Sequence, residues 1–183
     1  GIWLRLVKVL QSFHPFGMEN NTYHRRIHLT QILYGERRGK EGQLRTGCSA
    51  IIFNADRTKA LLTRRTDNGL WCIPGGGMEA GESAAEACIR EVWEETGLHV
   101  EVKRLIGVYS NPHQLAVYAD GNKAHFVVMS FEVEVTGGEL GLSNETTETG
   151  FFSVQEMETM PMHGKHKERG EDALLGLAEA LIK

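Results

Sequence analysis

Cysteine and proline are scarce in this chain, and long apolar runs are missing. The 183 residues include three cysteines and four prolines. An odd number of widely spaced cysteines does not suggest a disulfide framework, and the lack of a C-x-x-C pair gives no sign of a zinc site. We therefore expect a reducing compartment, the cytoplasm. No run of 18 apolar residues is present, so neither a transmembrane helix nor a membrane partner is expected.

An excess of positive charge is also missing. The formal net charge is -4, with 41% hydrophobic and 24% charged residues. Proteins that bind nucleic acid usually carry a basic balance, so no nucleic-acid partner is expected. The basic pairs Arg37-Arg38 and Arg64-Arg65 are short, and we expect the first to be solvated surface. The length and composition fit one ordinary globular domain with an extra terminal element.

The first 45 residues are weakly patterned, and we assign them to an N-terminal arm or helical extension ahead of a domain at 46–183. Apolar residues recur at helical spacing near the start: Trp3, Leu6, Val7, Leu10 and Phe13. This face would dock on the domain or on a second copy in a homodimer, or contact a membrane surface; alternatively, residues before Met18 are not native. We predict a short helix or arm over 19–45, with a linker at 37–43.

From residue 46 onward, apolar runs separated by turn residues predict strands and helices. The expected strands are 48–53, 60–65, 100–109, 126–135 and 150–154, the first two paired as a hairpin. Residues 110–122 are expected to be a loop, and Gly137-Gly138 a turn. Helices are expected over 83–96 and 168–183. Together these elements predict an α/β domain, with a mixed sheet between layers of helices.

The helix expected over 83–96 has clear ends. Ser83 and Glu86 form a capping box, and Gly97 is placed for a left-handed stop. The apolar stripe that we expect to be buried consists of Ala85, Cys88, Ile89 and Val92.

Three glutamates of this helix, Glu91, Glu94 and Glu95, stand at positions i, i+3 and i+4. Their charges repel within one turn, near the end of the helix where the dipole disfavours anions. Arg90 relieves only part of this conflict, whereas a bound Mg²⁺ would remove it. A solvated acidic face is the competing interpretation. The loop Ile73-Pro74-Gly75-Gly76-Gly77 favours the metal, because its glycines let backbone groups approach a phosphate closely.

The same segment resembles the Nudix signature G-x5-E-x7-R-E-U-x-E-E-x-G-U, in which U is a bulky aliphatic residue. All nine defined positions match: Gly76, Glu82, Arg90, Glu91, Val92, Glu94, Glu95, Gly97 and Leu98. The resemblance extends from about Thr46 to the C-terminus and implies a Nudix-type α/β/α sandwich.

The resemblance also implies roles for individual residues. Glu91 and Glu95 would be the principal ligands of Mg²⁺ or Mn²⁺, and Glu94 a further direct or water-mediated one. The Gly75 carbonyl would complete the metal shell. Glu82 and Arg90 would form a structural ion pair. The implied reaction is metal-assisted hydrolysis of a nucleoside diphosphate linked to another moiety, in which Glu91 doubles as the base.

Outside the signature, a downstream glutamate is expected to assist catalysis, Glu145 ahead of Glu148. Arg64 and Arg65 are candidates for phosphate contact, although alternation on a strand would point only one of them into the cleft. Trp71 is a candidate for stacking on a base, with core packing as the alternative. The histidines at 113, 125, 163 and 166 are scattered and predict no metal site, although one of them would be able to assist proton transfer.

The substrate is less well defined by the sequence. The segment Tyr109-Ser110-Asn111-Pro112 resembles the proline-containing loop of ADP-ribose hydrolases, with imperfect spacing. ADP-ribose is therefore favoured over nucleoside triphosphates and dinucleoside polyphosphates, and capped RNA ranks lower. A noncatalytic ligand-binding regulator is the alternative from another class.

Overall fold

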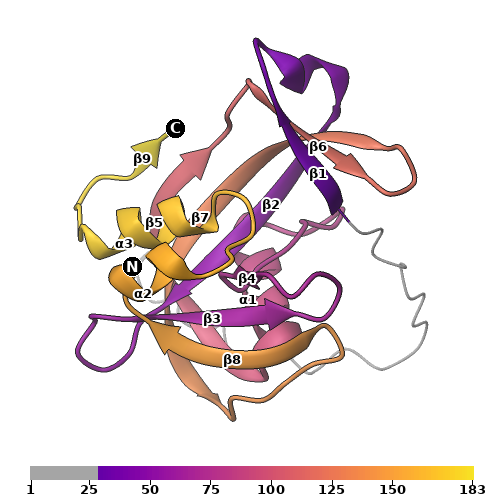
Figure 1. Ribbon diagram of the computed structural model, residues 1–183. Helices are drawn as coiled ribbons and strands as arrows, with labels where there is room; N and C mark the ends of the chain where they lie inside the picture. Colours follow the sequence, from indigo (N-terminus) through magenta and orange to yellow (C-terminus); the bar gives the residue numbers. More distant parts are fainter. Residues whose placement is uncertain (1–28) are drawn as a thin grey trace.

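The computed structural model describes residues 29–183, and two β-sheets form its centre (Figure 1). The larger sheet has the order β1 (Leu29–Tyr34), β6 (Gln114–Tyr118), β7 (Lys123–Gly138), β5 (Leu98–Tyr109) and β9 (Leu181–Ile182), with β2 (Gln43–Ile52) also paired to β7. The smaller sheet is β4 (Trp71–Cys72), β3 (Ala60–Arg65) and β8 (Thr146–Phe152). Because β2–β7 and β5–β9 are parallel and the other pairs antiparallel, the larger sheet is mixed, as predicted.

Helices lie on opposite faces of these sheets. The helices are α1 (Ala84–Thr96), α2 (Val154–Thr159) and α3 (His166–Leu174), with a short 3-10 turn, η1 (Arg38–Glu41). Along β2, Ala50 and Ile52 pack in one core with α1, whereas Ile51 between them packs in a second core with α2 and α3. Since alternate residues of a strand point to opposite faces, the sheets lie between α1 and the pair α2–α3. No helix of residues 29–183 is long and apolar enough to cross a membrane.

Helix α1 has both predicted ends. The Ser83 N–H donates to Glu86 Oε2 at 2.8 Å, and the Glu86 N–H donates to Ser83 Oγ at 3.2 Å, which completes the capping box. Gly97 adopts the left-handed conformation with φ 74°. The predicted buried stripe is wrong in part, because Ile89 is exposed and Ala85 is half-buried. The buried side instead comprises Ala87, Cys88, Glu91, Val92, Glu95 and Thr96.

The predicted hairpin of residues 48–53 and 60–65 is wrong. β2 and β3 belong to different sheets, and the turn between them is closed by an isolated bridge between Phe53 and Ala60 and by the Asn54 N–H, which donates to the Lys59 carbonyl at 3.0 Å. One edge of β2 pairs with β7 along its full length. Its other edge is paired with the glycine-rich loop, since the Cys48 and Ala50 N–H groups donate to the Gly76 and Pro74 carbonyls. The fold thus places the glycine-rich loop beside β2.

Three other expectations also need correction. We predicted a short helix or arm within residues 19–45. The described part of this segment instead contains β1 and the start of β2, which are strands of the larger sheet. The expected linker 37–43 contains η1, and β2 runs across the boundary that we predicted between residues 45 and 46. The loop predicted at 110–122 contains β6, whose five residues Gln114–Tyr118 lie between turns. The apolar face at residues 3–13 lies outside the described residues.

The predicted C-terminal helix 168–183 is correct only at its start. α3 ends at Leu174, and Gly176 then adopts a left-handed φ of 63°. The Arg104 guanidinium donates to the Leu177 carbonyl at 2.8 Å, and β9 adds to the edge of β5. The predicted strands 100–109, 126–135 and 150–154 are found as β5, β7 and β8, the last ending at Phe152.

Candidate metal and diphosphate site

Within the glycine-rich stretch 74–77 of the loop between β4 and α1, three of the four carbonyls accept hydrogen bonds. The Pro74 and Gly76 carbonyls accept the β2 N–H groups at 2.8 and 2.9 Å, and the Gly77 carbonyl accepts Arg90 Nη2 at 3.0 Å. Within residues 29–183 the Gly75 carbonyl accepts no hydrogen bond. Gly75 has φ 149°, and a Cβ there would lie 2.7 Å from Ser49 Cα, so only glycine fits.

Two of the three α1 glutamates are buried beside this loop. Glu91 and Glu95 are 2% and 5% exposed, whereas the Glu94 side chain is 41% exposed. The Gly75 N–H donates to Glu95 Oε2 at 3.0 Å. Gly76, which we expected to contact substrate, has its Cα against the Glu91 carboxylate, because an added Cβ would lie 2.5 Å from Glu91 Cδ. The glycine loop therefore holds both buried carboxylates.

Arg90 connects the loop to the acidic face of α1. The predicted ion pair with Glu82 is confirmed and bidentate, with Nε–Oε1 at 2.6 Å and Nη2–Oε2 at 3.0 Å. Arg90 Nη1 also reaches Glu91 at 3.0 Å and Glu94 at 3.2 Å. The hydrogen bonds with Glu82 raise the pKa of Arg90, and those with Arg90 lower the pKa of Glu82. Arg90 thus fixes α1, Glu82 and Gly77 as one unit.

The potential ligand atoms of the glycine loop and α1 suit a hard cation. The carboxylates of Glu91 and Glu95 and the Gly75 carbonyl all offer oxygen, which Mg²⁺ and Mn²⁺ prefer over sulfur. Among residues 29–183, no three His, Cys, Asp or Glu side chains are grouped closely enough to form a metal cage by themselves. Mg²⁺ does not require such a cage, because it usually keeps waters and shares one or two carboxylates with substrate phosphates.

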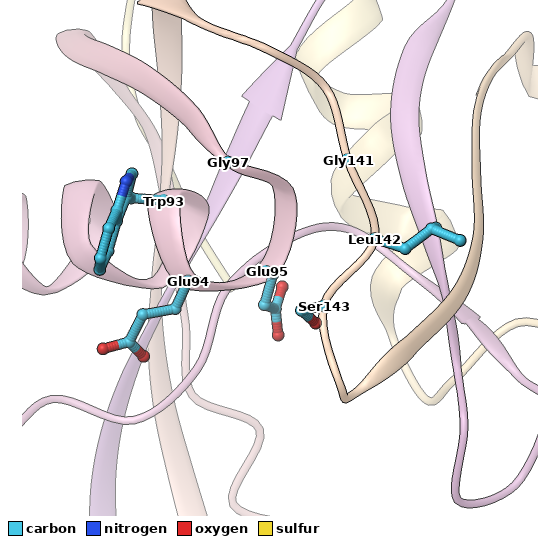
Figure 2. A pocket seen from close by; sticks show the side chains of 7 residues that line it. All are labelled: Trp93, Glu94, Glu95, Gly97, Gly141, Leu142 and Ser143. Carbon is cyan, nitrogen blue, oxygen red and sulfur yellow. The ribbon is translucent and has the colours of Figure 1, made fainter. Parts of the chain in front are cut away.

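A shallow pocket runs from the end of α1 to the loop between β7 and β8 (Figure 2). Its volume is about 370 Å³, and Glu94 and Glu95 line it together with Ser143. In Figure 2 the Glu95 carboxylate points toward Ser143, across the pocket. Glu145 stands two residues further along this loop, and its N–H donates to Ser143 Oγ at 3.1 Å. The loop thus brings Glu145 next to the wall of the pocket that faces α1.

Glu148 is placed differently from Glu145. It lies on β8 directly opposite Arg64 of β3, and the two side chains form an ion pair of 2.6 Å. Arg64 Nε also donates to the Gly69 carbonyl at 3.0 Å. The structure thus places the Arg64 guanidinium, for which we expected a substrate contact, on the other face of the smaller sheet, where it pairs with Glu148.

Arg65 is the member of the basic pair that faces the site. It shares its face of β3 with Leu61, which packs in the core of α1, whereas Leu62 packs on the opposite side. Asp67 holds the guanidinium through Nε at 2.8 Å and Nη2 at 2.5 Å. This pairing raises the pKa of Arg65, to which the negative charge of Glu95 also contributes. Residues 60–63 are all buried, so the sequence pattern of this strand gave no signal that distinguishes Arg65 from Arg64.

The same face carries Cys72, whose thiol lies against Thr63 at 3.4 Å. Burial and the neighbouring charge of Glu95 raise the pKa of the Cys72 thiol to about 11, so it stays protonated. All three cysteines are buried and free.

Trp71 lies on the other face of β4 and is not placed to stack on a substrate. Only 9% of it is exposed, and its ring meets Phe152 edge to face at 4.9 Å between centroids. Of the two interpretations given for Trp71 from the sequence, core packing is the one that describes its contacts in this structure.

The predicted proline-containing loop contacts other parts of the fold. The Pro112 carbonyl accepts the Gly39 N–H at 2.9 Å, and Asn111 Oδ1 accepts the His113 N–H at 2.9 Å. Tyr109 OH donates to Asp172 of α3 at 2.9 Å. These contacts attach the loop to η1 and α3, and do not connect it to the carboxylates of α1.

Comparison with known proteins identifies the family. Residues 43–173 match the model of the NUDIX domain, which is more than half of the chain. The chain belongs to the Nudix family. The match begins near the start of β2, three residues before the limit that the sequence suggested, and it reaches Ala173 in α3. The resemblance and the mixed α/β fold predicted from the sequence are thereby confirmed.

Individual relatives of this Nudix chain carry two kinds of name. A protein of Methanocaldococcus jannaschii named ADP-ribose pyrophosphatase is 38% identical over 102 residues, 54% of this chain and 57% of that protein. A MutT-like protein of Streptomyces ambofaciens is 36% identical over 99 residues, 54% of this chain and 58% of that protein. The chain thus spans little more than half the length of these curated relatives.

A solved structure agrees with the arrangement of the elements. The crystal structure of an ADP-ribose pyrophosphatase from Streptococcus suis superposes with a TM-score of 0.59 at 26% identity. The superposition covers 75% of this chain and 96% of that chain.

Proposed function

We propose that this Nudix chain is a Mg²⁺-dependent pyrophosphohydrolase, with Mn²⁺ as an alternative cation, and that it cleaves a nucleoside diphosphate linked to a second moiety. The observation that carries the proposal is that the glycine loop holds two buried carboxylates, Glu95 through the Gly75 N–H and Glu91 against Gly76, while the Gly75 carbonyl accepts no hydrogen bond within residues 29–183. A helix that served only stability would gain nothing from burying two like charges side by side. A cation and a diphosphate explain both features.

Each residue has a task in this proposal. Glu91, Glu95 and the Gly75 carbonyl would hold the cation, with Glu94 as a further ligand from the exposed side. A bound Mg²⁺ polarises the diphosphate and lowers the pKa of water. Arg90 would keep the carboxylates in position through its contacts with Glu82 and the loop.

Glu145 is the better candidate for the base that takes a proton from the attacking water. Glu91 is held by Arg90 at 3.0 Å and lies against Gly76, which suits a fixed ligand. Glu145 is exposed on the loop that borders the pocket of Glu94 and Glu95. A glutamate on such a loop can turn toward a water without disturbing the metal ligands.

ADP-ribose is the substrate that we favour. Two similar proteins, one known by sequence and one by structure, carry the name ADP-ribose pyrophosphatase. Arg65 supports a phosphate-containing substrate, because its guanidinium lies on the face of Glu95 and is held in a fixed orientation by Asp67. Hydrolysis adds the oxygen of water to one phosphorus atom, breaks the bond from that phosphorus to the bridging oxygen, and releases AMP and ribose 5-phosphate.

The test is a panel of substrates assayed with Mg²⁺ and with Mn²⁺, with chromatographic identification of the products. The panel contains ADP-ribose, nucleoside triphosphates, dinucleoside polyphosphates and sugar nucleotides. We expect metal-dependent release of AMP and ribose 5-phosphate. Nucleoside triphosphates are the second candidate, because one relative is named MutT-like. Cleavage of these compounds alone would support the proposed metal-dependent reaction and would overturn ADP-ribose as the substrate. Binding without turnover of any compound would favour a noncatalytic regulator.

A further inference from the structure

The segment 161–166 runs alongside β4 and continues its hydrogen bonds. The Trp71 N–H donates to the Pro161 carbonyl, and the His163 N–H donates to the Trp71 carbonyl, each at 2.8 Å. The next donor along the chain is the N–H of Ile73, a residue with no exposed surface. It donates at 3.0 Å to His166 Nδ1, a side-chain nitrogen from a position 93 residues away. An imidazole thus takes the place of a strand carbonyl at the point where the glycine loop begins.

This contact fixes the chemical form of His166. A backbone N–H can only donate, so Nδ1 must be the unprotonated nitrogen and Nε2 carries the proton. Desolvation and the nearby charge of Arg169 hold the pKa of His166 well below its ordinary value, which keeps the ring neutral. His166 is also the first residue of α3, so the contact joins that helix to the loop.

We infer that His166 is a positioning residue that holds the loop Ile73–Gly77 in place for the metal. Ile73 is two residues before Gly75, and its side chain packs in the core that also contains Ala173 of α3, so the His166 contact adds a directional hydrogen bond to this packing. Beyond Ile73, the loop is held by β2 at Pro74 and by Glu95 at Gly75. Loss of the acceptor would leave a buried N–H without a partner, and the loop would shift to satisfy it.

The inference rests on the proposed function, because it assigns the loop a metal-binding task. Groups that orient a ligand through a hydrogen bond change metal affinity by about 10- to 100-fold when they are removed. The expected effect of losing the His166 acceptor is therefore a weaker affinity for the cation, with the same fold and with little change in the substrate preference.

Two substitutions of His166 with similar polarity test whether the position of the hydrogen-bond acceptor matters, or only the presence of a polar side chain. His166→Asn places an amide oxygen near the position of Nδ1, whereas His166→Gln places it near Nε2. The readout is the affinity for Mn²⁺ in the absence of substrate, measured by electron paramagnetic resonance, with thermal unfolding to confirm the fold. We expect His166→Asn to bind Mn²⁺ within about threefold of the unmodified chain, and His166→Gln to bind about tenfold more weakly.

His113 provides a matched control, because its Nδ1 accepts the Arg37 N–H at the same distance of 3.0 Å, on a loop that contacts η1 rather than the glycine loop. His113→Gln should leave Mn²⁺ affinity unchanged. Equal affinities for the Asn and Gln variants of His166 would overturn the inference, and so would an equal loss in His113→Gln. If the unmodified chain itself bound no Mn²⁺, the proposed function would fail, which is a distinguishable result.

Discussion

The α-carbon of Gly76 lies against the carboxylate of Glu91, at a distance that leaves no room for a side chain. A Cβ at position 76 would lie 2.5 Å from Glu91 Cδ, well inside the distance at which two carbon atoms touch. The neighbouring Gly77 has no atom within 4 Å of the same position. Two adjacent glycines of one loop thus differ completely in what a methyl group would meet.

Gly76→Ala should therefore displace the Glu91 carboxylate and reduce metal-dependent turnover by about 100-fold or more, as loss of an oriented ligand does. Gly77→Ala is the matched variant and should stay within a few-fold of the unmodified chain. Turnover rates at saturating Mg²⁺ and circular dichroism spectra of both variants check this. Equal rates in the two variants would contradict the packing that we describe.

The ion pair of Glu82 with Arg90 should stabilise the fold in a pH-dependent way. Both side chains are about one-fifth exposed, and we expect Glu82→Gln to lower the free energy of unfolding by about 1–2 kcal/mol at pH 7. The folded-state pKa of Glu82 is lowered by Arg90. Its contribution is therefore complete above the unfolded pKa of about 4.3, and is lost as the pH falls through the folded value.

Urea denaturation of the two chains at pH 7 and near pH 3 measures this contribution. The difference between them should shrink toward zero at the lower pH. Glu101→Gln is the control, because Glu101 forms an exposed pair with Lys103 and should cost less than about 0.5 kcal/mol. A difference for Glu82→Gln that stayed constant down to pH 3 would argue against the assigned ion pair.

The two adjacent arginines of β3 should behave differently toward substrate. Arg65→Ala removes a charge on the face of Glu95, and should raise KM about tenfold or more, the value of one charge-assisted hydrogen bond. Arg64→Ala breaks an exposed pair with Glu148 on the other face, and should change KM less than about twofold. Steady-state kinetics with the best substrate of the panel decide between them. A larger increase in KM for Arg64→Ala than for Arg65→Ala would contradict the assignment of Arg65 to the face of the site.

Arg169 of α3 is a buried cation without a carboxylate partner in residues 29–183. It is 6% exposed, its Nη1 donates to Ser49 Oγ at 3.1 Å, and burial lowers its pKa to about 10. Because burying an unpaired charge opposes folding, Arg169→Met should cost less than about 1 kcal/mol or even stabilise the chain. Thermal unfolding measures the change. A loss above about 3 kcal/mol would contradict this and would show that the guanidinium has an anionic partner.

Features set by neighbouring residues were predictable from the sequence. Ser83, Glu86 and Gly97 determine the ends of α1 through contacts within four residues, and both ends were predicted correctly. The pairing of Glu82 with Arg90 was also predicted, from the family resemblance, because the signature fixes their spacing.

Features set by distant neighbours were not predictable. The apolar run at 48–53 reads as half of a hairpin, but its free edge is used by the glycine loop, and nothing local indicates that competition. The choice between Arg64 and Arg65 depends on which face of β3 packs on α1. Ile73 and His166 meet only because the chain returns along β4 after 93 residues.

Glu95→Gln tests the central claim most directly, because the amide oxygen can still accept the Gly75 N–H while the charge for the cation is lost. The measurement is the rate of ADP-ribose hydrolysis at saturating Mg²⁺, repeated over the substrate panel. We predict a fall of about 100-fold or more on the cleaved substrates, with an unchanged circular dichroism spectrum. A rate within twofold of the unmodified chain on every cleaved substrate would contradict the account.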